Sequence, residues 1–300
     1  YAVNNTSITV KGGAFKNIYG GGSRKKITGS THITIEGGTI DQVYGGNSSS
    51  PAEAIPGDTH VTVNGGTVGF VFGGGILGAV DGTAYTIINN KATITGNVYG
   101  GGNDISATVR NTTVIISGTV TGAAIGGGAA GNVLENTSLD LLGGSIGRNT
   151  YGGGLTGTVG GTASVTISNG ATVNFVFGGG EGADATCNAT DVTVTGGTIK
   201  GWLYGGGREG KVTQTAKTNI SGGTFDKSIC GGGCLAGSTS GNTEVTLTDV
   251  TLGNNTWVYG GGEQGSVTGL AKVTVKSGTI DKTVFPEDLG YGWHLREHGK

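Results

Sequence analysis

The sequence predicts an all-β protein, a right-handed parallel β-helix (β-solenoid) of about eleven rungs, each with about 26 residues and three short strands. Three observations predict this fold. An aromatic residue followed by glycines returns at one pitch, short segments alternate apolar and polar residues, and a pair of glycines follows many of these segments. No apolar period near 3.6 residues accompanies them, which argues against a helical repeat.

The aromatic-glycine signature sets the period. It first reads Tyr19-Gly20-Gly21-Gly22 and last Tyr259-Gly260-Gly261-Gly262, with spacings between 25 and 29 residues. Stacked rungs lie roughly 4.8 Å apart, so rings in equivalent positions should stack along the rod. We expect a structural aromatic ladder of Tyr19, Tyr44, Phe72, Tyr99, Tyr151, Phe177, Tyr204, Tyr259 and Phe285, with Ile125 and Cys230 in place of the ring in two rungs. The triple glycine beside it is expected because bulky rings leave little room for another side chain.

The alternating segments predict strands with one buried face. In Val61-Thr62-Val63 and Val273-Thr274-Val275 valine is expected to point inward and threonine outward. The predicted outward column is Thr9, Thr34, Thr62, Thr86, Thr166, Thr193, Thr246 and Thr274. Charged neighbours such as Glu36 and Lys272 fit an ice-binding plane poorly. We therefore interpret the threonines as residues that are favoured here by their high β-strand propensity.

The turns and the topology follow from the glycines and the period. Pairs such as Gly65-Gly66 and Gly196-Gly197 mark a corner that needs a positive φ or close backbone approach. In one typical rung we expect three short strands, with turns between them, in the segments 192–199, 202–207 and 210–213. Propeller blades need about 40 residues, which is longer than this period. Parallel strands joined by crossovers in one direction favour the right-handed sense.

Composition limits the partners and indicates the compartment. Charged residues are 13% of the chain and the formal net charge is −2, so we expect no nucleic-acid partner. No stretch is apolar enough to span a membrane, and no cofactor is predicted. Richness in Ser, Thr, Asn and Gly without Met is typical of an extracellular, cell-surface or envelope protein. Sequons make candidate glycosylation sites of Asn5, Asn111, Asn136, Asn188 and Asn254, although an Asn/Thr-rich chain also contains sequons by chance.

Three cysteines leave more than one interpretation open. Cys230 and Cys234 flank a triple glycine, and a disulfide between them requires Cα atoms within about 7 Å. Cys187 would then be free or would bridge to another subunit. Metal binding is the weaker alternative, because no paired Cys-x-x-Cys spacing supports it.

Two groups of side chains are candidates for chemistry. The charged residues Glu181, Arg208 and Glu209 fall on one loop edge and form the best catalytic candidate, weighed against plain solvated loop charges. His32 and His60 should face outward from adjacent rungs roughly 5 Å apart. Such a pair could begin a metal site or a pH-sensitive contact. Without a third ligand nearby, a solvated surface pair is the simpler interpretation.

The ends predict two segments. Residues 1–285 form the solenoid of aromatic-glycine repeats, and residues 286–300, which begin Pro286-Glu287-Asp288, form a tail or cap. Tyr1 leads almost directly into the first rung, so we expect an open N-terminal edge on which another copy could stack end to end into a fibre.

With glycine pairs such as Gly65-Gly66-Thr67-Val68 and its aromatic-glycine turns, the chain resembles the parallel β-helix repeat regions of prokaryotic surface proteins of the adhesin or haemagglutinin kind. The resemblance covers nearly all of the chain and lies in the style of the repeat. Departures are Ile125, Cys230 and the longer Pro51–Pro56 loop. The expected function is a non-enzymatic structural or adhesive rod whose partners are other copies, end to end or lateral, or cell-surface glycans. The alternative is a polysaccharide lyase or hydrolase on a parallel β-helix.

Overall fold

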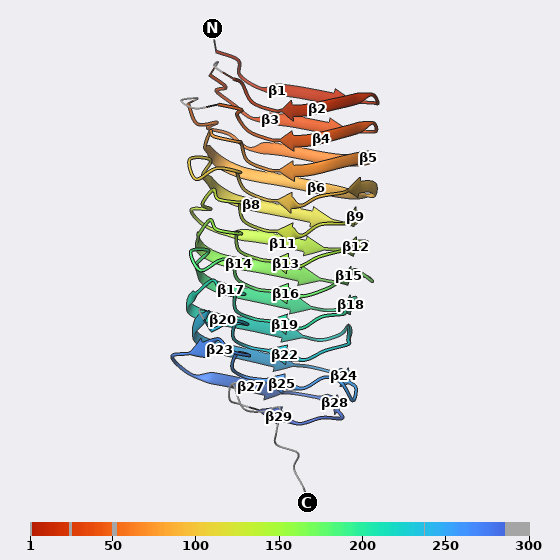
Figure 1. The fold of residues 1–300 in the computed structure, drawn as a ribbon, viewed down its shortest axis with the longest axis vertical. Coiled ribbons are helices and arrows are strands. Elements are labelled where there is room, and N and C mark those ends of the chain that lie inside the picture. Colours follow the sequence, from red (N-terminus) through yellow and green to blue (C-terminus); the bar gives the residue numbers. More distant parts are fainter. Residues whose placement is uncertain (1, 24–25, 50–52, 237, 286–300) are drawn as a thin grey trace, which may run out of the picture.

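The computed structural model describes residues 2–23, 26–49, 53–236 and 238–285; the predicted tail at 286–300 lies outside them. It is a β-solenoid: parallel strands stack into about eleven turns that lie about 26 residues apart along the sequence (Figure 1). The described residues contain strands and turns and no helix. These residues therefore include no helix that is long and apolar enough to span a membrane. The fold class is as predicted, and the right-handed sense stays a prediction.

The strands form three columns. The first column holds the strands that precede the glycine corner: β1 (Thr6–Val10), β3 (Thr31–Ile35), β5 (Thr59–Phe72), β6 (Val80–Ile94), β8 (Val109–Ile116), β11 (Thr137–Leu141), β14 (Val159–Ile167), β17 (Cys187–Val194), β20 (Val212–Ile220), β23 (Thr239–Leu247), β26 (Ser266–Val267) and β27 (Ala271–Val275). Segment 210–213, expected as a strand of its own, instead leads into β20 of the next rung.

The other two columns are shorter. After the glycine corner come β2 (Ala14–Tyr19), β4 (Thr39–Tyr44), β9 (Thr119–Val120), β12 (Ser145–Ile146), β15 (Thr172–Val173), β18 (Thr198–Ile199), β21 (Thr224–Phe225), β24 (Val250–Leu252) and β28 (Gly278–Ile280). The third column is β7 (Val98–Tyr99), β10 (Ala124–Ile125), β13 (Thr150–Tyr151), β16 (Val176–Phe177), β19 (Leu203–Tyr204), β22 (Ile229–Cys230), β25 (Val258–Tyr259) and β29 (Val284–Phe285). Near the N-terminus the columns merge within single strands such as β5.

The aromatic column is in hydrogen-bonded register throughout. Each member pairs with its equivalent in the next rung, from Tyr19 with Tyr44 to Tyr259 with Phe285, and Ile125 and Cys230 hold the two positions without a ring. Adjacent rings stack almost parallel, with centroids 4.5 Å apart for Phe72 and Tyr99 and 5.0 Å for Phe177 and Tyr204. The column fixes the rung registry over the whole rod.

The apolar side chains form two main layers. Valine, isoleucine and leucine from all three columns fill the tube, whereas the rings point to the other face of their strands. Most of the rings are still buried, and those of Tyr19 and Phe285 at the two ends are half-buried, because residues that follow the triple glycine, such as Ile76 and Leu155, pack against them. The ladder is therefore a second core outside the first.

The glycines act through the backbone. The second residue of each quoted pair has a positive φ, for example +83° at Gly66 and +83° at Gly197, as the corner requires. The first glycine of the triple has a different reason from the one expected. A Cβ on Gly152 would overlap the carbonyl oxygen of Gly178 in the next rung, so neighbouring backbone, and not a ring, excludes a side chain there.

For one threonine of the predicted outward column, the prediction was wrong. Thr86 pairs with the inward Val61 and is fully buried, and Ile87 takes the outward place beside Thr62. The same rung has Ala84 where its neighbours have a buried threonine, Thr59 and Thr112. The hydroxyl has thus moved two positions along the strand, which alternation alone could not show.

Candidate functional site

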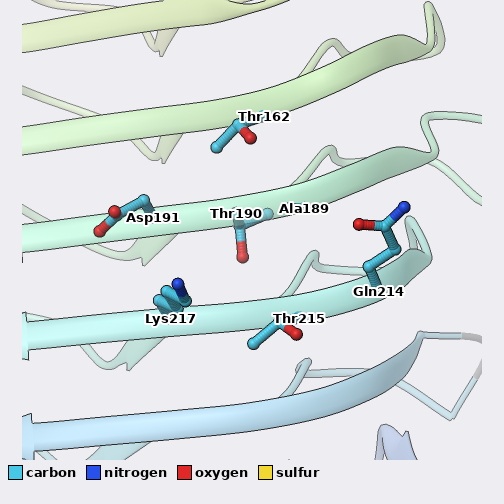
Figure 2. Close-up of a pocket in the computed structure, with 7 residues that line it drawn as sticks. All are labelled: Thr162, Ala189, Thr190, Asp191, Gln214, Thr215 and Lys217. Carbon is cyan, nitrogen blue, oxygen red and sulfur yellow. The ribbon is translucent and has the colours of Figure 1, made fainter.

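A shallow groove crosses the outward face of β14, β17 and β20 (Figure 2). Its volume is about 230 Å³, below the roughly 300–1,000 Å³ typical of small-molecule sites. It is lined by Thr162, Ala189, Thr190, Asp191, Gln214, Thr215 and Lys217. The lining offers hydroxyls, an amide, a carboxylate and an ammonium group, so it suits a polar surface ligand.

Irregular strand pairing produces this groove. Val159 of β14 pairs with Cys187 of β17, and the next paired residues are Thr162 and Ala189. Two residues of β14 therefore lie between the paired positions, opposite one residue of β17. On the other side of β17, Cys187 pairs with Val212 of β20, and the next paired residues are Thr190 and Ala216. Three residues of β20 lie between these positions, opposite two residues of β17. Each neighbour of β17 therefore carries one extra residue, and such bulges bend a strand and redirect its side chains.

A column of alternating charges begins at the groove. Asp191, Lys217, Glu244 and Lys272 are partners in the register of four consecutive rungs, on the outward face. Figure 2 shows Asp191 and Lys217 on neighbouring strands. The Asp191 carboxylate accepts a hydrogen bond from Asn219 Nδ2 at 3.2 Å. Over the described ranges, none of the four forms an ion pair within its own chain.

The predicted catalytic cluster is assembled, but its charges are paired. Arg208 Nη1 lies 3.3 Å from Glu181 Oε1 and 3.6 Å from Glu209 Oε1. Each of these three side chains is between 35% and 39% exposed. They form a surface ion-pair network, a type that contributes little stability per pair.

A second set of contacts extends this cluster along the ladder. The Tyr204 hydroxyl donates to Glu263 Oε2 at 2.6 Å, and the Cys234 thiol donates to the same oxygen at 3.4 Å. Glu263 lies two rungs beyond Tyr204, and the position between them in the aromatic column belongs to Cys230. Loss of the ring at Cys230 leaves room for this carboxylate. Burial, followed by the hydrogen bond to Glu263, raises the pKa of Tyr204.

The suggested disulfide between Cys230 and Cys234 is not formed in this structure. Cys234 is a free cysteine that donates its thiol hydrogen to Glu263, and Cys187 is free and buried. Burial raises the pKa of Cys234 to about 11 and that of Cys187 to about 12. Both thiols therefore stay protonated at neutral pH, unlike a catalytic thiolate.

His32 and His60 lie side by side, as expected, with ring centroids 4.5 Å apart, and His60 also stacks on Tyr85 at 4.7 Å. Burial and the neighbouring His32 lower the pKa of His60. The imidazole planes differ by only 7°, so one ion could not lie in both planes without a change of rotamer. In the part of the chain that the structure describes, no three His, Cys, Asp or Glu residues could hold a metal ion.

Several sequon asparagines belong to a hydrogen-bonded ladder. The side-chain oxygens of Asn5 and Asn136 accept from the backbone of the next rung, at 2.7 and 2.9 Å. The Nδ2 atoms of Asn111 and Asn188, where a glycan would be attached, donate to Glu135 and to the Gly160 carbonyl. Asn254 lies exposed in a turn.

A buried threonine ladder was missed by reasoning from the sequence. Its hydroxyls donate to the carbonyl of the glycine that directly follows the aromatic column in the same rung, at 2.5–2.7 Å, from the half-buried Thr6 and from the buried Thr31, Thr59, Thr112, Thr137, Thr190 and Thr243. These bonds join the first column to the aromatic turn. A threonine 14 to 17 residues before a glycine triplet was the available signal.

No family model matches this chain, and neither the curated proteins nor the solved structures contain a significant match to it.

Proposed function

We propose that this chain is an extracellular structural or adhesive rod, a component of a cell surface or envelope that acts through its long sides. The observation that supports this most is the unbroken register of the aromatic column from Tyr19 to Phe285. Each rung contacts mainly its neighbours in such a fold, so the product is an extended surface with repeated chemistry. A rod of this kind suits spacing and attachment.

The surface chemistry supports the same proposal. The outward positions of the long strands carry mainly hydroxyl, amide and isolated charged groups, and the one candidate catalytic cluster has its charges paired internally. Hydroxyl and amide rows can bind glycans or other polar polymers by many weak contacts. Repetition then raises the avidity of such contacts without any deep pocket.

The rod also offers edges for extension. Among the described strands, β1 pairs only with β3, and β2 pairs only with β4. Such an edge can accept either a preceding rung of a longer chain or a second copy. End-to-end growth is therefore part of the proposal, and either route lengthens the rod.

Surface labelling of intact source cells tests this proposal. An antibody against the folded rod should label unpermeabilised cells, and a short external protease treatment should remove the label. Purified protein should bind a subset of polysaccharides on a glycan array without releasing new chain ends. Label only after permeabilisation would contradict the proposed location, and release of reducing or unsaturated ends would favour the lyase or hydrolase alternative.

A further inference from the structure

We infer that the last four described rungs form a lateral docking surface for a second copy of this chain, whose rod axis runs antiparallel to that of the first. The surface is the charge column Asp191, Lys217, Glu244 and Lys272, together with the outward polar residues beside it. This inference deepens the proposed function, on which it rests, by naming a partner and a contact face. It depends on the signs of the charges and on their even spacing.

The order of the charges makes the column complementary to the same column of a second copy that runs in the opposite direction. From Asp191 to Lys272 the signs run negative, positive, negative, positive. A two-fold axis between Lys217 and Glu244, parallel to the strands, places Asp191 opposite Lys272 of the second copy and Lys217 opposite Glu244. All four positions then face an opposite charge, which is an isologous, closed contact.

The rung spacing lets all four contacts form at once. Both copies repeat at roughly 4.8 Å, so an alignment that is correct at one rung is correct at the next. A parallel arrangement in register would instead oppose like charges at every rung. A parallel arrangement offset by one rung would match three positions and leave one unmatched at each end. The antiparallel arrangement is therefore the one that the column favours.

The neighbouring columns are compatible with close approach. Beside the charges runs a row of small polar residues, Thr193, Asn219, Thr246 and Thr274, which meets its own copy across the axis. Lys217, Glu244 and Lys272 are exposed, and Asp191 is partly exposed. Over the described residues none of the four forms an ion pair within the chain, so each charge is available to the partner, and Asp191 keeps its hydrogen bond from Asn219.

The size of this surface predicts a weak, salt-sensitive contact. Four rungs about 4.8 Å apart and strands of about nine residues at roughly 3.3 Å give about 600 Å² on each copy. A standard stable interface buries about 800 Å² on each partner. Attraction between exposed charges is also screened beyond about 10 Å at 0.1 M salt. Pairing should therefore be visible at high protein concentration and low salt.

The test is sedimentation velocity, with small-angle scattering on the same samples, from micromolar to near-millimolar protein. For the wild type we expect a concentration-dependent dimer at about 20 mM salt whose association constant falls at least tenfold by about 500 mM. The dimer should be longer than the monomer, because only the last rungs overlap. A wild type that stays monomeric at low salt and the highest concentration would overturn the inference.

Charge variants separate this surface from nonspecific attraction. Lys217→Glu with Lys272→Glu makes the column wholly negative, and Asp191→Lys with Glu244→Lys makes it wholly positive. Each variant alone should lose association at least tenfold, and an equal mixture of the two should recover it. The matched control is Lys200→Glu with Lys227→Glu, which changes the net charge equally at exposed positions elsewhere and should associate like the wild type.

Two results would refute the charge pairing: association of the all-negative variant at wild-type strength, or a mixture no stronger than its components. Circular dichroism and thermal melting confirm that each variant is folded. The monomer's rod-shaped scattering at high salt does not depend on these charges. A wild type that keeps its rod-shaped scattering but does not pair therefore rejects this inference alone, whereas the cell-labelling experiment decides the proposed function.

Discussion

At the scale of single residues, the backbone of the next rung decides which side chains are tolerated. The first glycine of each triple lies against the carbonyl of its equivalent one rung on, and that carbonyl accepts a hydrogen bond from a buried threonine in most rungs. The motif is therefore a packing and hydrogen-bonding device. Sequence repetition revealed the glycines, but only the register showed what they touch.

Gly152→Ala should destabilise the fold by roughly 1–3 kcal/mol, because the new Cβ overlaps the Gly178 carbonyl and forces a backbone shift. Gly253→Ala is the matched control, since a Cβ there meets nothing within 4 Å and its φ is not in the left-handed region. It should be neutral or slightly stabilising. Urea unfolding followed by circular dichroism measures both, and equal effects of the two changes would contradict this explanation.

Thr190→Val should cost about 1–3 kcal/mol, because it keeps the side-chain shape but removes the 2.6 Å hydrogen bond to the buried Gly205 carbonyl. Thr193→Val, on the outward face of the same strand, is the control and should change stability by less than about 0.5 kcal/mol. The two variants differ in solvent exposure and partner, not in chemistry. An equal loss of stability in denaturant unfolding would show that the buried ladder has no special role.

At the scale of elements, the third strand column holds two cores together. Its inward residues join the main apolar core, and its alternate residues form the stacked ring ladder. Alternation and period predicted the strands, the ladder and the corners. The sequence also placed Glu181, Arg208 and Glu209 on one loop edge, where the structure brings them together. The groove and the contact of Glu263 with Tyr204 were not predictable, because they depend on one-residue bulges and on side chains that span two rungs.

Phe177→Ala should destabilise the solenoid by about 3–5 kcal/mol, because Phe177 is 2% exposed and stacks on both Tyr151 and Tyr204. Phe175→Ala removes a ring of the same kind that is 40% exposed, and should cost under about 1.5 kcal/mol. Chemical denaturation of both variants provides the comparison. If the exposed ring proves as important as the buried one, the ladder is not the second core.

The ladder tyrosines should make the fold sensitive to alkali. Burial raises the pKa of Tyr44, Tyr151 and Tyr259 to about 12, above the value of about 10 in an unfolded chain. A raised pKa favours the neutral form in the folded state, so its stabilising effect is complete below pH 10. It is lost as the pH rises from 10 through 12.

Absorbance at 295 nm, recorded against pH beside circular dichroism, tests this expectation. Part of the tyrosine signal should appear only above about pH 11 and together with unfolding. The same chain in guanidinium provides the control and should titrate near pH 10. Complete ionisation near pH 10 with the fold unchanged would mean that the rings are accessible to solvent.

At the scale of the whole molecule, the fold is close to one-dimensional. Rungs contact their neighbours through one continuous parallel register, and the sequence repeats the same structural unit along the rod (Figure 1). Length and composition already indicated an elongated single unit with a polar exterior. The partner could not be read from the sequence, because the charge column is recognisable only after the register has aligned Asp191, Lys217, Glu244 and Lys272.

The central claim is that the protein works as an exposed rod. Electron cryomicroscopy of the native protein, isolated from its source without added tags, tests it most directly. We expect isolated or joined rods with a rung repeat of about 4.8 Å and with their long sides accessible to solvent. Compact particles in which other domains enclose the sides of the solenoid would contradict the claim.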